Sequence, residues 1–222
     1  MSPKSISRGT PRAYRSELRK QQAESTRSRV VATAAELFAA DGYARTTLAK
    51  IAEAAGVSAE TVQTQGPKAA LLIAAIEYAA FGVTGEKSIL NLDVGRTLMA
   101  IEGCQEAVDF LVAAQTDVHQ RTAQLALALI GGAGADPELD KYLNEILANI
   151  NLQSRGILGS FRDRGWLRDD VPFDEIVETA VVLCSVDTYL RIVHRDGWSV
   201  DTYRKWLRRM LSEAVFAKSE AT

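Results

Sequence analysis

The residues best suited to recognition chemistry lie in the short segment 59–65, which reads Ala-Glu-Thr-Val-Gln-Thr-Gln. Gln63 and Gln65 each carry an amide that can form a bidentate hydrogen-bonded pair with an adenine edge. The threonine hydroxyls beside them can contact a phosphate or a thymine methyl group. Side chains of this kind, presented by one short helix, are typical of a protein that reads double-stranded DNA.

Two short helices are expected to position this segment. Thr46 and Thr47 offer N-cap hydroxyls to a helix that ends at Gly56, and Ser58 caps the next helix, which runs to about Gln65. The small residues of the turn allow a close helix crossing, and in a helix-turn-helix the second helix enters the major groove. Helical enzymes also contain such corners, so the turn alone leaves both readings open.

Helical periodicity continues on both sides of this pair. Apolar residues recur at spacings of three and four from about Ala23 until Asp41-Gly42, and a fourth helix is expected from Lys68 to beyond Tyr78. Further helices are expected at these ranges: 94–116, 117–130, 137–164, 173–195 and 200–216. We place the breaks among them at residues 131–134, 165–172 and 196–198. The sequence therefore predicts an all-α fold of about nine helices.

Charge divides the chain into a basic head and an acidic body. Residues 1–70 carry 11 Lys and Arg against 6 Asp and Glu, whereas the remainder carries 15 against 22. This asymmetry is expected of a nucleic-acid binder with a separate domain that does not face the DNA. A solvated basic tail without a partner is the alternative that charge alone leaves open.

Catalysis, metal binding and membrane insertion find no support in the residue pattern. The chain has only two histidines, His119 and His194, with no Gly-rich phosphate loop and no metal-ligand spacing, so we expect neither an enzyme nor a cofactor or metal. Cys104 and Cys184 lie far apart in apolar segments and are interpreted as core residues in a reducing compartment. Without a long apolar run or a signal peptide, a cytoplasmic location is expected.

A series of motifs follows in fixed order between about residues 25 and 75: Arg29-Val30-Val31-Ala32-Thr33-Ala34-Ala35-Glu36-Leu37-Phe38, Asp41-Gly42-Tyr43, Thr46-Thr47, Ile51-Ala52, Ala55-Gly56-Val57-Ser58 and Lys68. In this order and spacing they resemble the DNA-binding domain of tetracycline-repressor-type (TetR family) transcriptional regulators. A weaker likeness continues in the segment Arg164-Gly165-Trp166-Leu167-Arg168-Asp169-Asp170 and in Gly197-Trp198.

The resemblance implies a homodimer with a three-helix DNA-binding head and a larger helical body that binds a small-molecule effector. Residues 1–20 would then form a flexible basic arm, residues 21–67 the DNA-binding domain, and residues 68–222 the domain for ligand binding and dimerisation. The residues expected to contact DNA are Thr46, Thr47, Ser58, Glu60, Thr61, Gln63, Thr64, Gln65 and Lys68.

The segment before Lys68 departs from the family pattern. The family usually has a tyrosine where Gln63 stands, followed by an aromatic pair before the lysine, and this chain is one residue shorter there. Either the glutamines serve as the polar contacts instead, or the head binds DNA weakly or in another register.

An effector pocket is expected where polar or aromatic residues interrupt the apolar stripes of the body. The candidates are Tyr78, Phe81, Phe110, Gln115, His119, Gln153 and Asp187. The expected function is a DNA-binding repressor released from a palindromic operator by its effector. The alternative is a homodimeric ligand-sensing or protein-docking module that has lost DNA binding.

Overall fold

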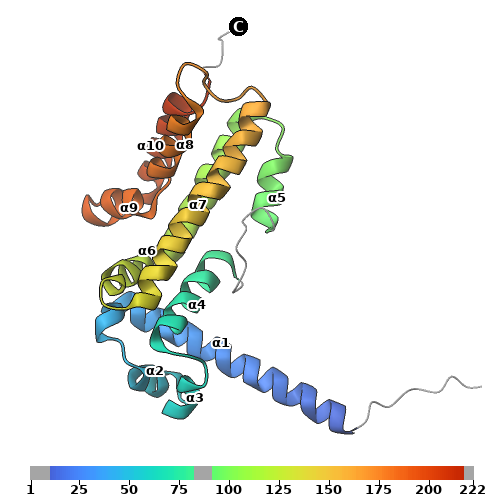
Figure 1. Ribbon diagram of the computed structural model, residues 1–222, viewed down its shortest axis with the longest axis vertical. Coiled ribbons are helices and arrows are strands. Elements are labelled where there is room, and N and C mark those ends of the chain that lie inside the picture. The colour runs from blue at the N-terminus through green and yellow to red at the C-terminus, as the bar shows by residue number, and fades with distance from the viewer. Residues whose placement is uncertain (1–10, 83–91, 218–222) are drawn as a thin grey trace, which may run out of the picture.

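The computed structural model describes residues 11–82 and 92–217 and confirms the all-α fold (Figure 1). Its described elements are α1 (Pro11–Arg45), α2 (Leu48–Ala55), α3 (Ala59–Gln63), α4 (Lys68–Phe81), α5 (Asp93–Ala100), α6 (Cys104–Ala133), α7 (Pro137–Asp163), α8 (Phe173–Leu183), α9 (Val186–Tyr189), the π-helix η2 (Leu190–Arg195) and α10 (Val200–Ala214). The head formed by α1–α4 lies at one end of the long α6–α7 pair, and α8 and α10 lie at the other end (Figure 1).

Helix α1 begins well before the expected start of the head. It runs from Pro11, so residues 11–20, expected to be part of a flexible arm, are helical. Almost every described side chain of α1 before Val30 is exposed, and this half of the helix extends away from the rest of the molecule (Figure 1). Residues 1–10 of the expected arm lie outside the described residues. Near its other end the helix turns sharply at Gly42, whose φ of 75° favours glycine.

The apolar side chains form two cores that share α6. The first core joins α1–α4 to residues 125–133 of α6 and to Leu139 of α7. The second core joins the earlier part of α6 to α5, α8, α9, η2, α10 and the last turns of α7. The head therefore packs into a core that continues past the expected domain boundary at residue 67.

The expected helix boundary between residues 116 and 117 is wrong. The chain breaks instead at residues 101–103, and α6 runs without interruption from Cys104 to Ala133. Thr116 lies in the interior of α6, where its hydroxyl donates to the carbonyl of Val112 at 2.6 Å. Its hydroxyl is therefore not a cap, and Asp117 next to it forms an ion pair with Arg204 of α10.

The break expected at residues 131–134 is also wrong for its first three positions. Helix α6 continues through both glycines, and at Gly132 the missing side chain leaves room for a neighbouring element. A Cβ atom on Gly132 would lie 2.7 Å from Cδ1 of Tyr43 and 2.7 Å from Cδ1 of Leu139. Gly132 is thus a contact point between α6, the end of α1 and the start of α7.

The single helix expected over residues 173–195 is divided into three. Helix α8 ends at Leu183, Ser185 caps α9 by accepting a hydrogen bond from the amide of Thr188 at 3.1 Å, and the π-helix η2 follows. A π-helix is rare and often marks a functional position. The break leaves the carbonyl of Cys184 available to side chains of α6.

The two neighbouring glycines of α6 predict opposite effects on stability. Gly132→Ala should lower the free energy of unfolding by about 1–3 kcal/mol, because its methyl group would collide with Tyr43 and Leu139. Gly131→Ala should raise it by up to about 1 kcal/mol, because a Cβ there meets no atom within 4 Å and alanine favours a helix. Urea denaturation of both variants tests this, and equal effects would contradict the packing described.

Candidate nucleic-acid interface and effector site

Helices α2 and α3 form a helix-turn-helix whose two N-termini are capped by the expected hydroxyls. Thr47 accepts a hydrogen bond from the amide of Lys50 at 3.2 Å, and Ser58 accepts one from the amide of Thr61 at 3.2 Å. Gly56 ends α2 in the left-handed conformation, with φ 63°. Val62 is fully buried in the first core. One face of α3 is therefore fixed in the head and the other faces solvent.

The outward face of α3 is polar. Glu60, Gln63 and Thr64 are exposed and Thr61 is half-buried. Hydrogen bonding to its own backbone amide, and then to Ser58, lowers the pKa of Glu60, so this carboxyl is ionised at neutral pH. The surface thus presents amide, hydroxyl and carboxylate groups of the kinds that read base edges.

Gln65 lies outside the helix on which it was expected. Helix α3 ends at Gln63, and the Gln65 amide turns back to donate to the Thr64 hydroxyl at 3.3 Å. Its carbonyl accepts a hydrogen bond from the Arg27 guanidinium of α1 at 3.3 Å. Gln65 therefore stabilises the end of α3 and is turned away from the role expected for it at a base edge.

Thr46 is a correction to the expected DNA contacts. Its side chain is fully buried, and its hydroxyl donates to the carbonyls of Leu37 and Gly42 at 3.2 and 2.8 Å. The hydroxyl fixes the corner after α1, while the neighbouring Thr47 remains exposed. Of the two threonines, only Thr47 has an exposed side chain.

Lys68 is held by the head in this structure. Its ammonium donates to the carbonyl of Tyr43 at 3.0 Å and lies 3.9 Å from the centre of the Tyr43 ring. The side chain is half-buried. To contact a phosphate, the Lys68 ammonium must leave the carbonyl of Tyr43 and bind a phosphate oxygen instead.

Tyr43 connects the head to the body, a role that the sequence reasoning missed. Its ring stacks on Phe38 at 5.9 Å and covers Gly132, and its hydroxyl donates to the carboxylate of Asp136. Asp136 also caps α7 by accepting from the amide of Glu138 at 3.0 Å. Burial and this hydrogen bond raise the pKa of Tyr43, and the tyrosine hydroxyl lowers the pKa of Asp136. We call this set of contacts the Tyr43 clamp.

Two of the expected effector residues, Gln115 and His119, meet at the break after α8. Their side-chain nitrogens both lie within hydrogen-bond reach of the carbonyl of Cys184, at 3.0 and 2.9 Å. His119 is 5% exposed, and burial lowers its pKa, so the ring is neutral at pH 7. A donor role at Nε2 leaves Nδ1 as the acceptor of the ring.

The other expected effector residues are scattered. Tyr78 and Asp187 are exposed, whereas Phe81, Phe110 and Gln153 are half-buried on three different helices. Phe110 packs against the second core. The structure therefore supports a polar site around Gln115 and His119 but does not gather all seven residues there.

The sequence reasoning missed the aromatic side of this site. Tyr189 of α9 lies between His119, at 5.4 Å, and Tyr203 of α10, at 5.1 Å between ring centres. The Tyr203 side chain is fully buried, yet its hydroxyl forms no hydrogen bond with any described residue. A buried hydroxyl without a partner is uncommon and points to a position where a ligand could supply one.

Among residues 11–82 and 92–217, no three His, Cys, Asp or Glu side chains come together in an arrangement that could hold a metal ion. The described helices include none that combines the length and the apolar character needed to cross a bilayer.

Comparison with known proteins agrees with this geometry. Residues 30–63 match the family described as "Bacterial regulatory proteins, tetR family". No curated protein sequence matches the chain significantly.

Solved structures match over most of the chain. A transcriptional regulator from Saccharomonospora viridis, in complex with choline, is 19% identical and covers 88% of this chain and 100% of its own, with a TM-score of 0.69. A TetR-family regulator from Syntrophomonas wolfei is 14% identical, with coverages of 90% and 99% and a TM-score of 0.68. SmeT in complex with triclosan is 16% identical, with coverages of 88% and 93% and a TM-score of 0.68.

The Tyr43 clamp predicts a pH-dependent contribution to stability. The pKa of Asp136 is lowered in the folded state from an ordinary value of 3.8, so its contribution is present above that pH and is lost as the pH falls through the folded pKa. Tyr43→Phe should therefore cost about 1 kcal/mol at pH 7, and the cost should shrink below about pH 4.

Urea denaturation at several pH values measures this difference. The matched control is Tyr43→Phe in an Asp136→Asn background, where Asn retains the N-cap of α7 but cannot ionise. There the cost should not vary with pH, and the same variation in both backgrounds would rule out the clamp as its source.

Proposed function

We propose that this chain, whose residues 30–63 match the tetR family and whose fold is that of TetR-family transcriptional regulators, is a repressor that binds a palindromic operator as a homodimer and leaves it when a small molecule binds. The observation that carries the proposal is the exposed polar face of α3. Gln63 faces solvent at the end of a helix that is capped by Ser58 and anchored by the buried Val62. Thr64 follows as the C-cap, and its hydroxyl donates to the carbonyl of Thr61 at 2.7 Å. The Gln63 side chain is free to enter a major groove.

The proposed phosphate contacts surround this face. Thr47, at the N-terminus of α2, offers a hydroxyl beside the free amides of the first helical turn, a combination that suits a phosphate oxygen. Lys68 would reach a second phosphate on leaving the carbonyl of Tyr43. Ser58, Glu60, Thr61 and Thr64 complete the proposed set with Gln63, whereas the buried Thr46 is not part of it.

The homodimer is proposed to use the outer surfaces of α8 and α10. The apolar stripe of α10 cannot serve, because Tyr203, Leu207 and Leu211 are buried in the second core of one chain. The outer surface of α8 carries the exposed Glu178 and Val182. On α10, Lys205 and Arg209 are exposed and of opposite charge to Glu178, so a two-fold pairing could bring complementary charges together.

In the proposed dimer, the two α3 helices must lie at a separation that lets both enter the same DNA duplex. Half-sites of a palindrome lie about 34–36 Å apart, one helical turn, when both helices enter the same face of the DNA. A ligand that prefers another separation would weaken operator binding, and such coupling is typically 1–3 kcal/mol.

The effector is proposed to bind beside the break after α8. Gln115 offers its amide, Nδ1 of His119 offers an acceptor, Tyr189 offers an aromatic wall, and the Tyr203 hydroxyl is without a partner in the described structure. Support comes from solved relatives of the same fold that were determined with choline and with triclosan. Small organic molecules are therefore the class to test.

In vitro selection from a random DNA pool at physiological salt tests the DNA-binding proposal. The full-length protein should enrich a palindromic site. Gln63→Ala should then weaken binding of the dimer to that site by about thirtyfold or more, since each of the two bidentate base contacts that it removes is worth about 1–3 kcal/mol. Gln120→Ala, an exposed glutamine on α6, is the matched control and should bind as the parent does. A pool without an enriched palindrome would favour a ligand-sensing or protein-docking module that has lost DNA binding.

The proposed effector site predicts an unusual effect of Tyr203→Phe. Removing a buried hydroxyl that lacks a partner should raise the free energy of unfolding by up to about 1 kcal/mol. Compounds that raise the Tm of the parent protein should raise the Tm of this variant less. The exposed Tyr78→Phe should change neither quantity, and a destabilised Tyr203→Phe variant would show that the hydroxyl has a partner in solution.

A further inference from the structure

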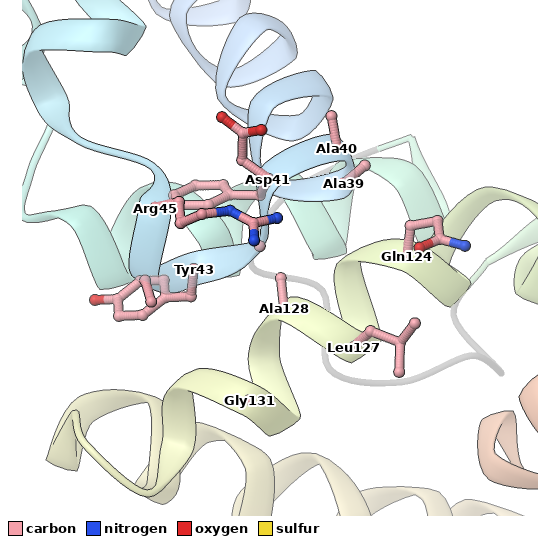
Figure 2. Close-up of a pocket in the computed structure, with 12 residues that line it drawn as sticks. Ala39, Ala40, Asp41, Tyr43, Arg45, Gln124, Leu127, Ala128 and Gly131 are labelled. Atoms are coloured by element: carbon pink, nitrogen blue, oxygen red, sulfur yellow. The ribbon is translucent and has the colours of Figure 1, made fainter.

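A cavity that is open to solvent lies at the junction of head and body, away from the effector site proposed above. It has a volume of about 360 Å³ and lies between the end of α1, residues 38–45, and one face of α6 (Figure 2). None of the seven effector residues expected from the sequence lines it. Its size falls in the range of small-molecule sites in proteins.

The walls of this junction cavity expose apolar and polar surface in similar amounts. Ala39 and Ala40 line it from α1, and Leu127, Ala128 and Gly131 line it from α6. The Leu127 side chain is 44% exposed although it is large and apolar. An apolar group bound between the two helices would cover this surface, which water now contacts.

The charges at the junction cavity favour an anion. Asp41 is neutralised by the ammonium of Lys50 at 3.2 Å. Arg45 is exposed, forms no hydrogen bond or ion pair with any described residue, and lines the junction cavity (Figure 2). A guanidinium without a partner beside apolar side chains is suited to a carboxylate that carries a hydrocarbon group.

We propose that the junction cavity is a binding site for a small amphipathic monocarboxylate, whose carboxylate pairs with Arg45 and whose hydrocarbon part packs against Leu127 and Ala128. The occupant would touch both sides of the contact that the Tyr43 clamp holds, since Tyr43 follows Asp41 and Gly42 in the same wall. A bound molecule would therefore hold the end of α1 against α6. Binding can be measured without DNA, so its outcome is separate from that of the proposed repressor function.

Octanoate is a suitable probe, and NMR titration of the full-length ¹⁵N-labelled protein measures both its affinity and its location. We expect a Kd on the order of 1 mM for a ligand of this size, with the largest shifts at residues 38–45 and 124–131. Octan-1-ol, which lacks the charge, should bind more weakly. Arg45→Gln should weaken octanoate binding about fivefold, the effect of one exposed ion pair.

Gly131→Leu blocks the cavity without disturbing the fold, because a Cβ at Gly131 meets no atom within 4 Å and leucine favours a helix. It should weaken octanoate binding at least about tenfold. Gly156→Leu is the matched control, a helical glycine of α7 with equally open surroundings and no part in the cavity, and it should bind as the parent does.

Three results would overturn the proposal: equal binding of octanol and octanoate, unchanged binding by Gly131→Leu, or shifts centred on Gln115 and His119 instead of the junction. The third result would place the carboxylate in the proposed effector site of the body. Binding by the parent and Gly156→Leu, with loss in Gly131→Leu, would support the junction cavity even if no operator were found.

Discussion

The position of the head depends on one close approach, that of the Tyr43 ring to the backbone of Gly132. Only a residue without a side chain lets the ring reach α6. From there the Tyr43 hydroxyl meets Asp136 at the start of α7, while its carbonyl holds Lys68 at the start of α4. A single residue, through its side chain and its backbone carbonyl, therefore fixes the end of α1 against two body helices and against the helix that follows α3.

Helix α6 connects the Tyr43–Gly132 contact to the body because it belongs to both cores. Its last turns belong to the first core and its earlier turns to the second core. The second-core stretch between Val112 and Ala123 contains three buried polar side chains in a helix that is otherwise apolar inside: Thr116, His119 and Thr122. One residue from Thr122, Arg121 donates to the carbonyls of Ala79 and Ala80, at 2.8 and 3.1 Å, near the end of α4. Through Arg121, this segment of α6 is hydrogen-bonded to the end of α4, and α4 is part of the head.

The sequence predicted the parts of the fold that local chemistry decides. Caps at Thr47 and Ser58 and the left-handed turn at Gly56 follow from residue types alone, and all three are confirmed. The break expected at Gly131-Gly132 was wrong, since a glycine that ends a helix and one that admits a neighbouring ring look the same in sequence. The division of the segment 173–195 was missed because it depends on donors from α6, which a local pattern does not contain.

The residues of the candidate effector site were also predictable only where a local sequence pattern marks them. Gln115 and His119 could be picked out as polar interruptions of an apolar stripe, and the structure places them together. Tyr203 could not, because its spacing with Leu207 and Leu211 is that of an ordinary core stripe. What distinguishes it is the lack of a partner for its hydroxyl, which only the packing of α9 and α10 reveals.

The turn between α3 and α4 is one residue shorter than in the family pattern and lacks its aromatic residues. Helix α3 is therefore supported by other contacts than the family pattern would give. With no aromatic residue between Val62 and Lys68, the turn is held by two cations, Arg27 on the carbonyl of Gln65 and Lys68 on that of Tyr43. A cation–carbonyl contact near the surface is screened by salt and can be exchanged for a phosphate, whereas an aromatic contact cannot. Under the proposed function, a DNA phosphate near this turn would compete with the two carbonyls for the same cations, whereas the buried Val62 keeps α3 in the first core.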